Sequence, residues 1–224
     1  KLKIQFPERK TIFGRKLQNL RYGENPHQQG SIYVNDYNDK QLGFNQIHGK
    51  ELSYNNYNDI FSSLEILNSL KKNSGTVVIK HANPCGVSQN KVPFVSFKNA
   101  YASDPISAFG GVIACNYKIN RKIASEIGKN FLEVILAKGF DKDSLKILKR
   151  KKNLRIVDIS NFKLKNLTAI KSFERSFLIQ SKDNIIVDKK KLRCVTKLKP
   201  SKKEMVEVQF AFNISKHVKS NAIV

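Results

Sequence analysis

Short apolar runs alternate with segments of helical periodicity over residues 76–159, and this alternation constrains the fold more than any other feature. The first run, residues 76–79, is rich in β-branched residues and has no regular polar alternation, which is typical of a strand buried on both faces. Strands separated by helices predict an α/β chain with right-handed crossovers. The sequence therefore predicts one sheet with helices on both of its faces.

Turn and capping residues set the limits of the predicted elements. Asn58 or Asp59 is predicted to cap a helix whose apolar residues recur at helical spacing up to Leu70, and Gly75 to end that region. Further helices are predicted over residues 94–102, 121–128 and 143–151. Strands are predicted over residues 31–34, 76–79, 111–115, 131–137, 154–159 and 176–181.

The two ends of the chain are less regular. Residues 1–20 are basic and weakly patterned, and we expect a linker there. Residues 160–200 form a basic, looped segment, and a change of composition near 185–200 is the candidate subdomain boundary. Pro200 and Ser201 open a last helix. One face of that helix is predicted to carry Met205, Val208, Phe212 and Ser215.

Composition indicates a globular chain. Its 224 residues suffice for one large or two small domains, and 40% hydrophobic residues support a buried core. Cys85, Cys115 and Cys194 lie far apart and form no Cys-x-x-Cys pair, which favours a reducing cytoplasm. No apolar run approaches the roughly 18 residues of a membrane helix. We expect a cytoplasmic fragment, cut at both ends, that does not bind membranes.

The charge is strongly basic, with 41 Lys and Arg against 18 Asp and Glu and a formal net charge of +23. Such a balance favours anionic partners: nucleic acid, phosphorylated metabolites or polyglutamylated cofactors. The alternative is compositional drift, because Lys, Asn and Ile are abundant together. Aromatic residues do not alternate with the lysines as a base-stacking surface requires. We therefore attribute the positive charge to compositional drift together with a site for a small anionic ligand, rather than to nucleic-acid binding.

The most informative motif is Lys80-His81-Ala82-Asn83-Pro84-Cys85-Gly86, which directly follows the predicted strand 76–79. If that strand belongs to a parallel sheet, its carboxyl end faces the crevice where ligands bind. A cationic and a titrating side chain before a Pro/Gly turn suit a preorganised site, although a surface loop with a solvated Lys fits the pattern equally well.

Two other polar motifs have the same ambiguity. In residues 21–28, Arg21 can grip a phosphate while Gly and Pro turn the backbone around a ligand, but an ordinary polar loop is the simpler interpretation. In residues 103–111, Gly110-Gly111 permits positive φ and close backbone approach, or a plain turn between helix and strand.

Common cofactor and metal motifs are missing from the sequence. It contains no Walker loop and no Gly-x-Gly-x-x-Gly. Residues 84–88 invite comparison with zinc deaminases, whose signature requires Pro-Cys-x-x-Cys and His-x-Glu. Ser88 replaces the second Cys, and none of the four histidines has Glu two positions later. Cys85 alone cannot supply a zinc ligand set, so we expect no zinc.

Taken together, the motifs point to one family. Six runs occur in its order, at residues 21–28, 49–56, 78–86, 104–111, 193–197 and 219–224. On these runs, from about residue 8 to the end, the chain closely resembles the bifunctional AICAR transformylase/IMP cyclohydrolases. The resemblance implies three-layer α/β/α, cytidine-deaminase-like units without zinc. It also implies a linker at 1–20 after an absent cyclohydrolase domain, a first transformylase unit at 21–190, and a truncated second unit from 191.

The implied reaction is formyl transfer from 10-formyltetrahydrofolate to the 5-amino group of AICAR (5-aminoimidazole-4-carboxamide ribonucleotide). The resemblance implies that His81 transfers the proton, that Lys80 is a cation beside the developing charge, and that Asn221 orients the reacting groups. It further implies a homodimer with sites at the interface, and a chain that is inactive by itself. Substrate-binding positions implied by the resemblance are Arg21, Tyr22, His27, Gly110 and Glu133.

Two alternatives come from other functional classes. A lysine-rich nucleic-acid-binding module predicts a steep salt dependence of DNA binding. A zinc-dependent nucleoside deaminase predicts bound metal.

Overall fold

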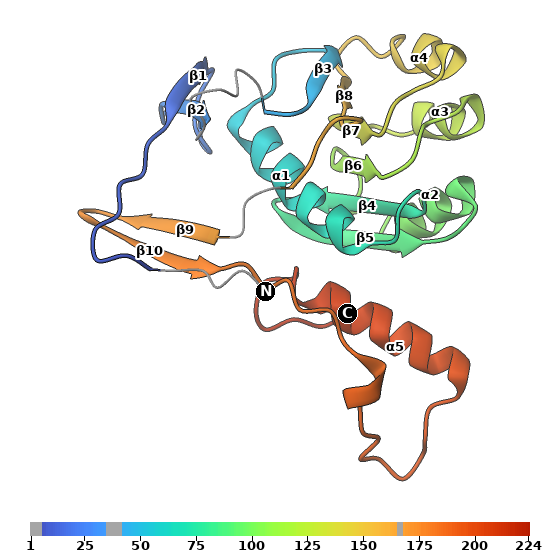
Figure 1. Cartoon of the computed structure of the whole chain (residues 1–224). Helices are drawn as coiled ribbons and strands as arrows, with labels where there is room; N and C mark the ends of the chain where they lie inside the picture. The colour runs from blue at the N-terminus through green and yellow to red at the C-terminus, as the bar shows by residue number, and fades with distance from the viewer. Residues whose placement is uncertain (1–5, 35–41, 165–167) are drawn as a thin grey trace.

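The computed structural model describes residues 6–34, 42–164 and 168–224 (Figure 1). A six-stranded mixed sheet forms its centre. The order across the sheet is β3 (Asn45–His48), β8 (Arg155–Asp158), β7 (Val134–Ala137), β6 (Val112–Cys115), β4 (Gly75–Lys80) and β5 (Asn83–Gln89). Only β6, β7 and β8 run parallel to one another, whereas β3 and β5 are antiparallel to their neighbours and β4 is antiparallel to both β5 and β6.

Helices cover both faces of this sheet, as the sequence predicts (Figure 1). Helix α1 (Tyr54–Ser69) packs on one face, against alternate strand residues such as Val77 and Leu136. The other strand residues, Val78 and Ile135 among them, face the remaining three helices. These are α2 (Pro93–Ala102), α3 (Arg121–Gly128) and α4 (Lys142–Leu148). The three-layer α/β/α prediction is confirmed.

The start of α1 differs from the sequence prediction. Ser53 is the N-cap: its hydroxyl accepts from the Asn56 amide, and the Asn56 side chain accepts in return from the Ser53 amide. This reciprocal capping box satisfies two backbone donors, so the helix begins five or six residues before the predicted position. Asn58 and Asp59 therefore lie inside the helix, and the prediction that either caps it is wrong.

Strand β5 falls on residues 83–89, where we expected a loop after Lys80. Pro84 and Gly86 are rare within strands, which hid this element in the sequence. The strand lies at the edge of the sheet, where the missing N–H of a proline costs little. The pairing also shifts register between Val78 and Ile79, opposite the proline.

Two separate hairpins flank the central sheet. Strand β1 (Arg15–Leu20), at the end of the expected linker, pairs with β2 (Gly30–Val34). Strand β9 (Thr168–Phe173), which the sequence did not indicate, pairs with β10 (Ser176–Ser181). Figure 1 shows the β9–β10 hairpin projecting away from the three-layer core.

The chain ends with a 3-10 turn, η1 (Lys189–Lys191), and helix α5 (Lys202–Ser215), which Ser201 caps with a second capping box. Ile214 is buried and Phe210 packs against the α1-side core. The face predicted to carry Met205, Val208 and Phe212 is not the face that packs on the core, because Val208 and Phe212 are 54% and 61% exposed. The helix packs through the neighbouring side instead.

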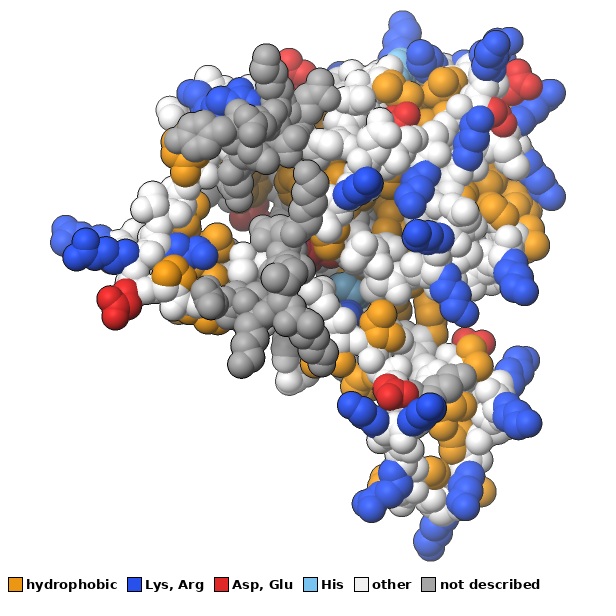
Figure 2. Space-filling model, viewed as in Figure 1, with side chains coloured by type: hydrophobic (Ala, Val, Ile, Leu, Met, Phe, Trp, Pro, Cys, Tyr) orange, Lys and Arg blue, Asp and Glu red, His pale blue; other side chains and the backbone are white. Residues whose placement is uncertain are grey.

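Lys and Arg side chains are spread over the surface rather than gathered in one patch on the face seen in Figure 2. Among the described residues, no helix combines the length and the apolar character that crossing a membrane requires.

Candidate functional site

A tight turn of His81 and Ala82 joins β4 to β5, and it carries the first predicted site residues. Both residues have φ of 56°, in the left-handed region that non-glycine residues seldom occupy. The His81 residue is exposed, whereas Lys80 is half-buried. The sequence argument from a parallel sheet is wrong here, because β4 is antiparallel to β6. The turn therefore lies beside the amino end of β6, where Ile79 pairs with Val112.

Two distant segments hold this turn. The Ala82 amide donates to Asp59 Oδ1 on α1 at 2.6 Å. From the C-terminal segment, the Lys219 amide donates to Asn83 Oδ1 and Lys219 Nζ donates to the His81 carbonyl, both at 3.4 Å. Burial raises the pKa of Asp59, although the Ala82 hydrogen bond and the nearby His81 oppose that shift.

Lys80 connects the turn to the loop that contains Gly110. Its Nζ donates to the Phe109 carbonyl at 2.8 Å, and the Gly110 amide donates to the Phe131 carbonyl at 2.9 Å. Gly110 has φ of +71°, so a side chain at this position would be strained. Lys80 is thus fixed against a loop whose backbone approaches β7 closely.

Glu133 lies just before β7 and reaches α1. Its amide donates to the Gly111 carbonyl at 3.1 Å. Its carboxylate accepts from Asn56 Nδ2 at 2.8 Å and lies 3.8 Å from Arg155 Nη1. The negative charge of Glu133 also contributes to the raised pKa of Asp59, so these two carboxylates share one electrostatic environment.

Arg21, Tyr22 and His27 belong to the loop between β1 and β2. The Gly23 amide closes this loop by donating to the Gln28 carbonyl at 2.7 Å. Arg21 and His27 are exposed, and the Arg21 guanidinium lies 5.7 Å from the centre of the Tyr22 ring. Two groups that can carry positive charge are therefore available to an anion.

Asn221 is exposed near the end of the chain, and its Oδ1 accepts from the Ser220 hydroxyl at 3.2 Å. It follows Lys219 by two residues. Because Lys219 contacts the turn at His81, the fold brings the Asn221 segment to the same region as Lys80 and His81.

The amino-terminal part of α1 connects these motifs. Asn55 Nδ2 donates to the Glu24 carbonyl at 3.2 Å, Asn56 binds Glu133, and Asp59 binds the Ala82 amide. The structure thus ties the Arg21 loop, Glu133 and the His81 turn to three positions of one helix. Sequence reasoning assigned no role to Asn56, whose one signal was the motif at residues 49–56, and it interpreted Asp59 only as a possible helix cap.

The thiols near the site are poor nucleophiles. Burial raises the pKa of Cys85 to about 11, with Asp104 adding to the shift, and burial raises the pKa of Cys115 to about 12. The reactive form of a thiol is the thiolate, which both environments disfavour. Within the described ranges, no group of three or more His, Cys, Asp or Glu residues could hold a metal ion.

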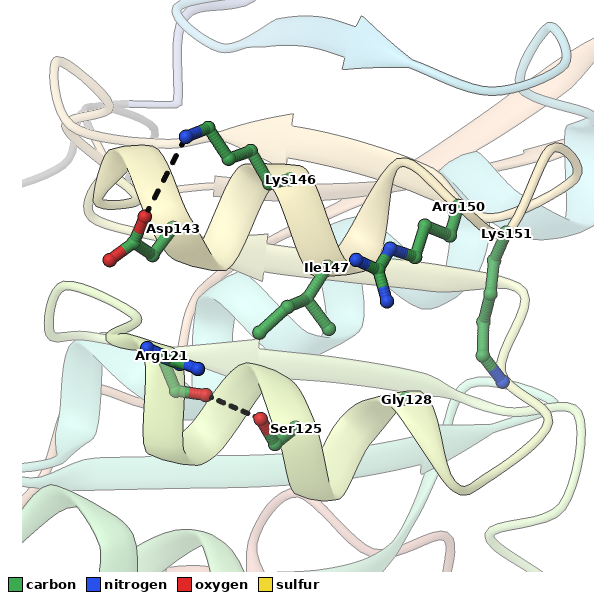
Figure 3. A pocket seen from close by; sticks show the side chains of 8 residues that line it. All are labelled: Arg121, Ser125, Gly128, Asp143, Lys146, Ile147, Arg150 and Lys151. Carbon is green, nitrogen blue, oxygen red and sulfur yellow. Dashed lines mark hydrogen bonds and ion pairs between the residues drawn. The ribbon is translucent and has the colours of Figure 1, made fainter.

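A groove of about 570 Å³ lies elsewhere, between α3 and α4 (Figure 3). Asp143 and Lys146 form an ion pair of 4.0 Å at its edge. No predicted site residue lines it, and four of its eight lining residues are basic. The lining residues are Arg121, Ser125, Gly128, Asp143, Lys146, Ile147, Arg150 and Lys151.

Comparisons with known proteins agree with the arrangement of motifs. A bifunctional purine biosynthesis protein PurH from Thermoanaerobacter sp. (strain X514) is 43% identical over 224 residues, covering 99% of this chain and 43% of the relative. The protein of the same name from Elusimicrobium minutum (strain Pei191) is 43% identical over 223 residues, covering 100% of this chain and 42% of the relative. The chain therefore spans less than half of the length of these relatives.

A solved dCMP deaminase from the cyanophage S-TIM5 matches with a TM-score of 0.34 and 11% identity, over 44% of this chain and 93% of that one. The family profile described as AICARFT/IMPCHase bienzyme matches residues 1–224, the whole sequence. The chain belongs to the AICARFT/IMPCHase bienzyme family of purine biosynthesis.

Proposed function

We propose that the protein transfers a formyl group from 10-formyltetrahydrofolate to the 5-amino group of AICAR, giving FAICAR in the synthesis of IMP. The observation that supports this most is the convergence of three motifs. Lys80 and His81 lie at a constrained turn, Lys80 contacts the Gly110 loop, and α1 binds both Glu133, through Asn56, and the turn, through Asp59. A basic group, a titrating imidazole and a carboxylate are the groups that acyl transfer to an amine requires.

The chemistry explains these requirements. The lone pair of the AICAR amine is delocalised into the imidazole and carboxamide, so the amine attacks only when it is held in place and loses its proton. As its nitrogen bonds to the formyl carbon, an oxyanion forms. The carbon–N10 bond of the folate then breaks, and N10 takes up the proton. In this proposal His81 carries the proton, Lys80 stabilises the oxyanion, and Asn221 orients the reacting groups.

The remaining site residues are proposed to bind AICAR. Arg21 and His27 present two exposed groups that suit a phosphate, with Tyr22 beside them. Glu133 offers a carboxylate that can accept hydrogen bonds from the base. At Gly110, the backbone can approach the base because no side chain intervenes.

The domain arrangement is also proposed. Residues 1–20 would link to an IMP cyclohydrolase domain, residues 21–190 would form the first transformylase unit, and residue 191 would begin the second. The protein would work in the cytoplasm as a homodimer, with sites at the interface and without zinc. The family match over all 224 residues favours neither a nucleic-acid-binding module nor a zinc-dependent deaminase.

The test is formyl transfer measured in the protein at the length of its relatives. We expect His81→Ala to lower kcat by about 10²–10⁴-fold, because positioned proton transfer typically contributes that much. Lys80→Ala is expected to lower kcat by about 10²–10³-fold through lost charge stabilisation. Lys146→Ala, which removes an equally charged but 79% exposed side chain on α4, is the matched control. Wild-type turnover in either site variant would refute the assigned roles.

A further inference from the structure

We propose that Asp59 is a positioning residue, whose carboxylate holds the Ala82 amide so that His81 is presented in one orientation. This inference rests on the proposed function, because it assigns His81 the proton transfer. The carboxylate is not proposed to touch the substrate. It acts through the backbone of the turn that carries the imidazole.

The carboxylate is held in a fixed place. Asp59 precedes Ile60, which is fully buried in the α1-side core, and α1 is closed at its start by the capping box of Ser53. A hydrogen bond of 2.6 Å from the Ala82 amide to Asp59 Oδ1 therefore ties the turn to a packed helix. Side chains on packed helices position a site more accurately than side chains on loops.

The turn needs this support. His81 and Ala82 are consecutive non-glycine residues with φ of 56°, and such backbone persists only where the surroundings fix it. The Ala82 amide donates to Asp59 Oδ1, and the backbone of His81 also opposes the rise in the pKa of that carboxyl. On the other side, Lys219 contributes contacts of 3.4 Å to Asn83 and to the His81 carbonyl, which are long for hydrogen bonds. The short contact to Asp59 is thus the stronger of the two restraints.

The position of the carboxylate is costly for the fold, which favours a functional reason for it. Burial disfavours the charged form of Asp59, and the charge of Glu133 disfavours it further. An apolar side chain on this face of α1 would avoid both penalties. The benefit that offsets these penalties is a hydrogen-bond acceptor for the Ala82 amide.

The experiment compares Asp59→Ala, Asp59→Asn and a control, Asp143→Asn, which changes a 60% exposed carboxylate on α4. We expect Asp59→Ala to lower kcat by about 10²-fold with the KM for AICAR nearly unchanged, since small displacements of a catalytic group cost about that much. Asp59→Asn keeps an acceptor oxygen and should recover most of kcat. Hydrogen exchange at the Ala82 amide should become faster in Asp59→Ala alone.

The proposal is overturned if Asp59→Ala keeps kcat within about twofold of the wild type, or if Asp59→Asn is as slow as Asp59→Ala, judged against the roughly 10²-fold loss expected above. Asp59→Ser, whose hydroxyl is too short to reach, replaces the alanine variant if that variant fails to fold. Failure of the proposed function is distinguishable, because His81→Ala would then stay active. Exchange at the Ala82 amide would still report on the hydrogen bond itself.

Discussion

The central layers and the C-terminal segment, residues 168–224, bury their apolar residues to very different extents. All residues of β6 and β7 are buried, and helices cover both faces of the sheet they belong to. In the C-terminal segment, Phe173 and Leu178 are 54% and 64% exposed, and Ile214 is the one buried residue of α5. The central layers are therefore stabilised by their own packing, whereas the segment depends on a few contacts.

Those few contacts are mainly polar. Lys182 pairs with Glu65 on α1, and Lys219 reaches the turn at His81. Within the segment itself, the Val187 amide donates to Asn213 Oδ1 at 3.1 Å. The residues of the candidate site therefore lie on two regions that differ in how firmly they are packed. Lys80, His81 and Glu133 are built on the packed layers, while Asn221 belongs to a segment with little apolar burial.

The largest expected difference between the two regions is in thiol reactivity. Cys194 is exposed in the C-terminal segment, whereas Cys115 is fully buried in β6 with its pKa raised to about 12. Alkylation of Cys115 requires unfolding of the core, so we expect it to be at least about 10³-fold slower than that of Cys194. Mass spectrometry of timed iodoacetamide reactions measures both rates.

Cys85 should react at an intermediate rate. Because its pKa is raised to about 11, the alkylation of Cys85 should become faster as the pH rises towards that value. Comparable rates at Cys115 and Cys194 would break the comparison.

Truncating one side chain in each region tests the same difference in packing through the free energy of unfolding. Ile135→Ala opens a cavity in β7, where the residue is fully buried, and should lower the free energy of unfolding by about 2–5 kcal/mol. Phe212→Ala removes a ring that is 61% exposed and should change the free energy of unfolding by no more than about 0.5 kcal/mol. Urea denaturation measures both values. Equal losses would mean that α5 is packed as firmly as the sheet.

Two glycine substitutions test how tightly the central layers are packed. A Cβ at Gly86 would lie 1.9 Å from the Ala100 carbonyl oxygen, so Gly86→Ala must displace α2 from β5 and should cost at least about 1–3 kcal/mol. At Gly128, on α3, the nearest atom lies 3.7 Å away. Gly128→Ala should stabilise the protein by up to about 1 kcal/mol, because alanine is the better helix former. Thermal melts of the two variants should shift in opposite directions.

The smallest effect is expected at the polar attachment of the segment. Lys182→Ala removes the ion pair with Glu65, and such partly exposed pairs are worth about 0.2–1 kcal/mol. The free energy of unfolding should hardly change, but trypsin should cleave residues 183–203 sooner than in the wild type. Lys146→Ala, which removes a surface pair within α4, should leave that cleavage rate unaltered. Cleavage within the sheet before cleavage of the segment would contradict the comparison.

The sequence predicted the central layers well because their signals are local. Buried strands such as β6 and helices such as α3 show their identity in apolar runs and helical spacing. Strand direction is not local, which is why β4 could not be predicted to run antiparallel to β6. Strand β5 was missed because an edge position tolerates Pro84 and Gly86, which otherwise argue against a strand.

The candidate site was predictable to a similar extent. Lys80, His81 and Gly110 stand in motifs whose order along the chain is recognisable. Asp59 was interpreted as a possible cap, because an aspartate near a helix start usually has that role. Its contact with Ala82 joins residues that are 23 positions apart and depends on how α1 lies on the sheet, which spacing alone cannot give.

The contacts of α1 also determine where the chain tolerates changes in length. Asn55, Asn56 and Asp59 each hold a different loop, so their directions around the helix axis matter together. Inserting one residue between Asn56 and Asp59 would turn the rest of the helix by about 100° and separate these three partners. Insertions in the exposed turn between β9 and β10 disturb none of them. Over evolution, indels should therefore accumulate in that hairpin and be excluded from the first turns of α1.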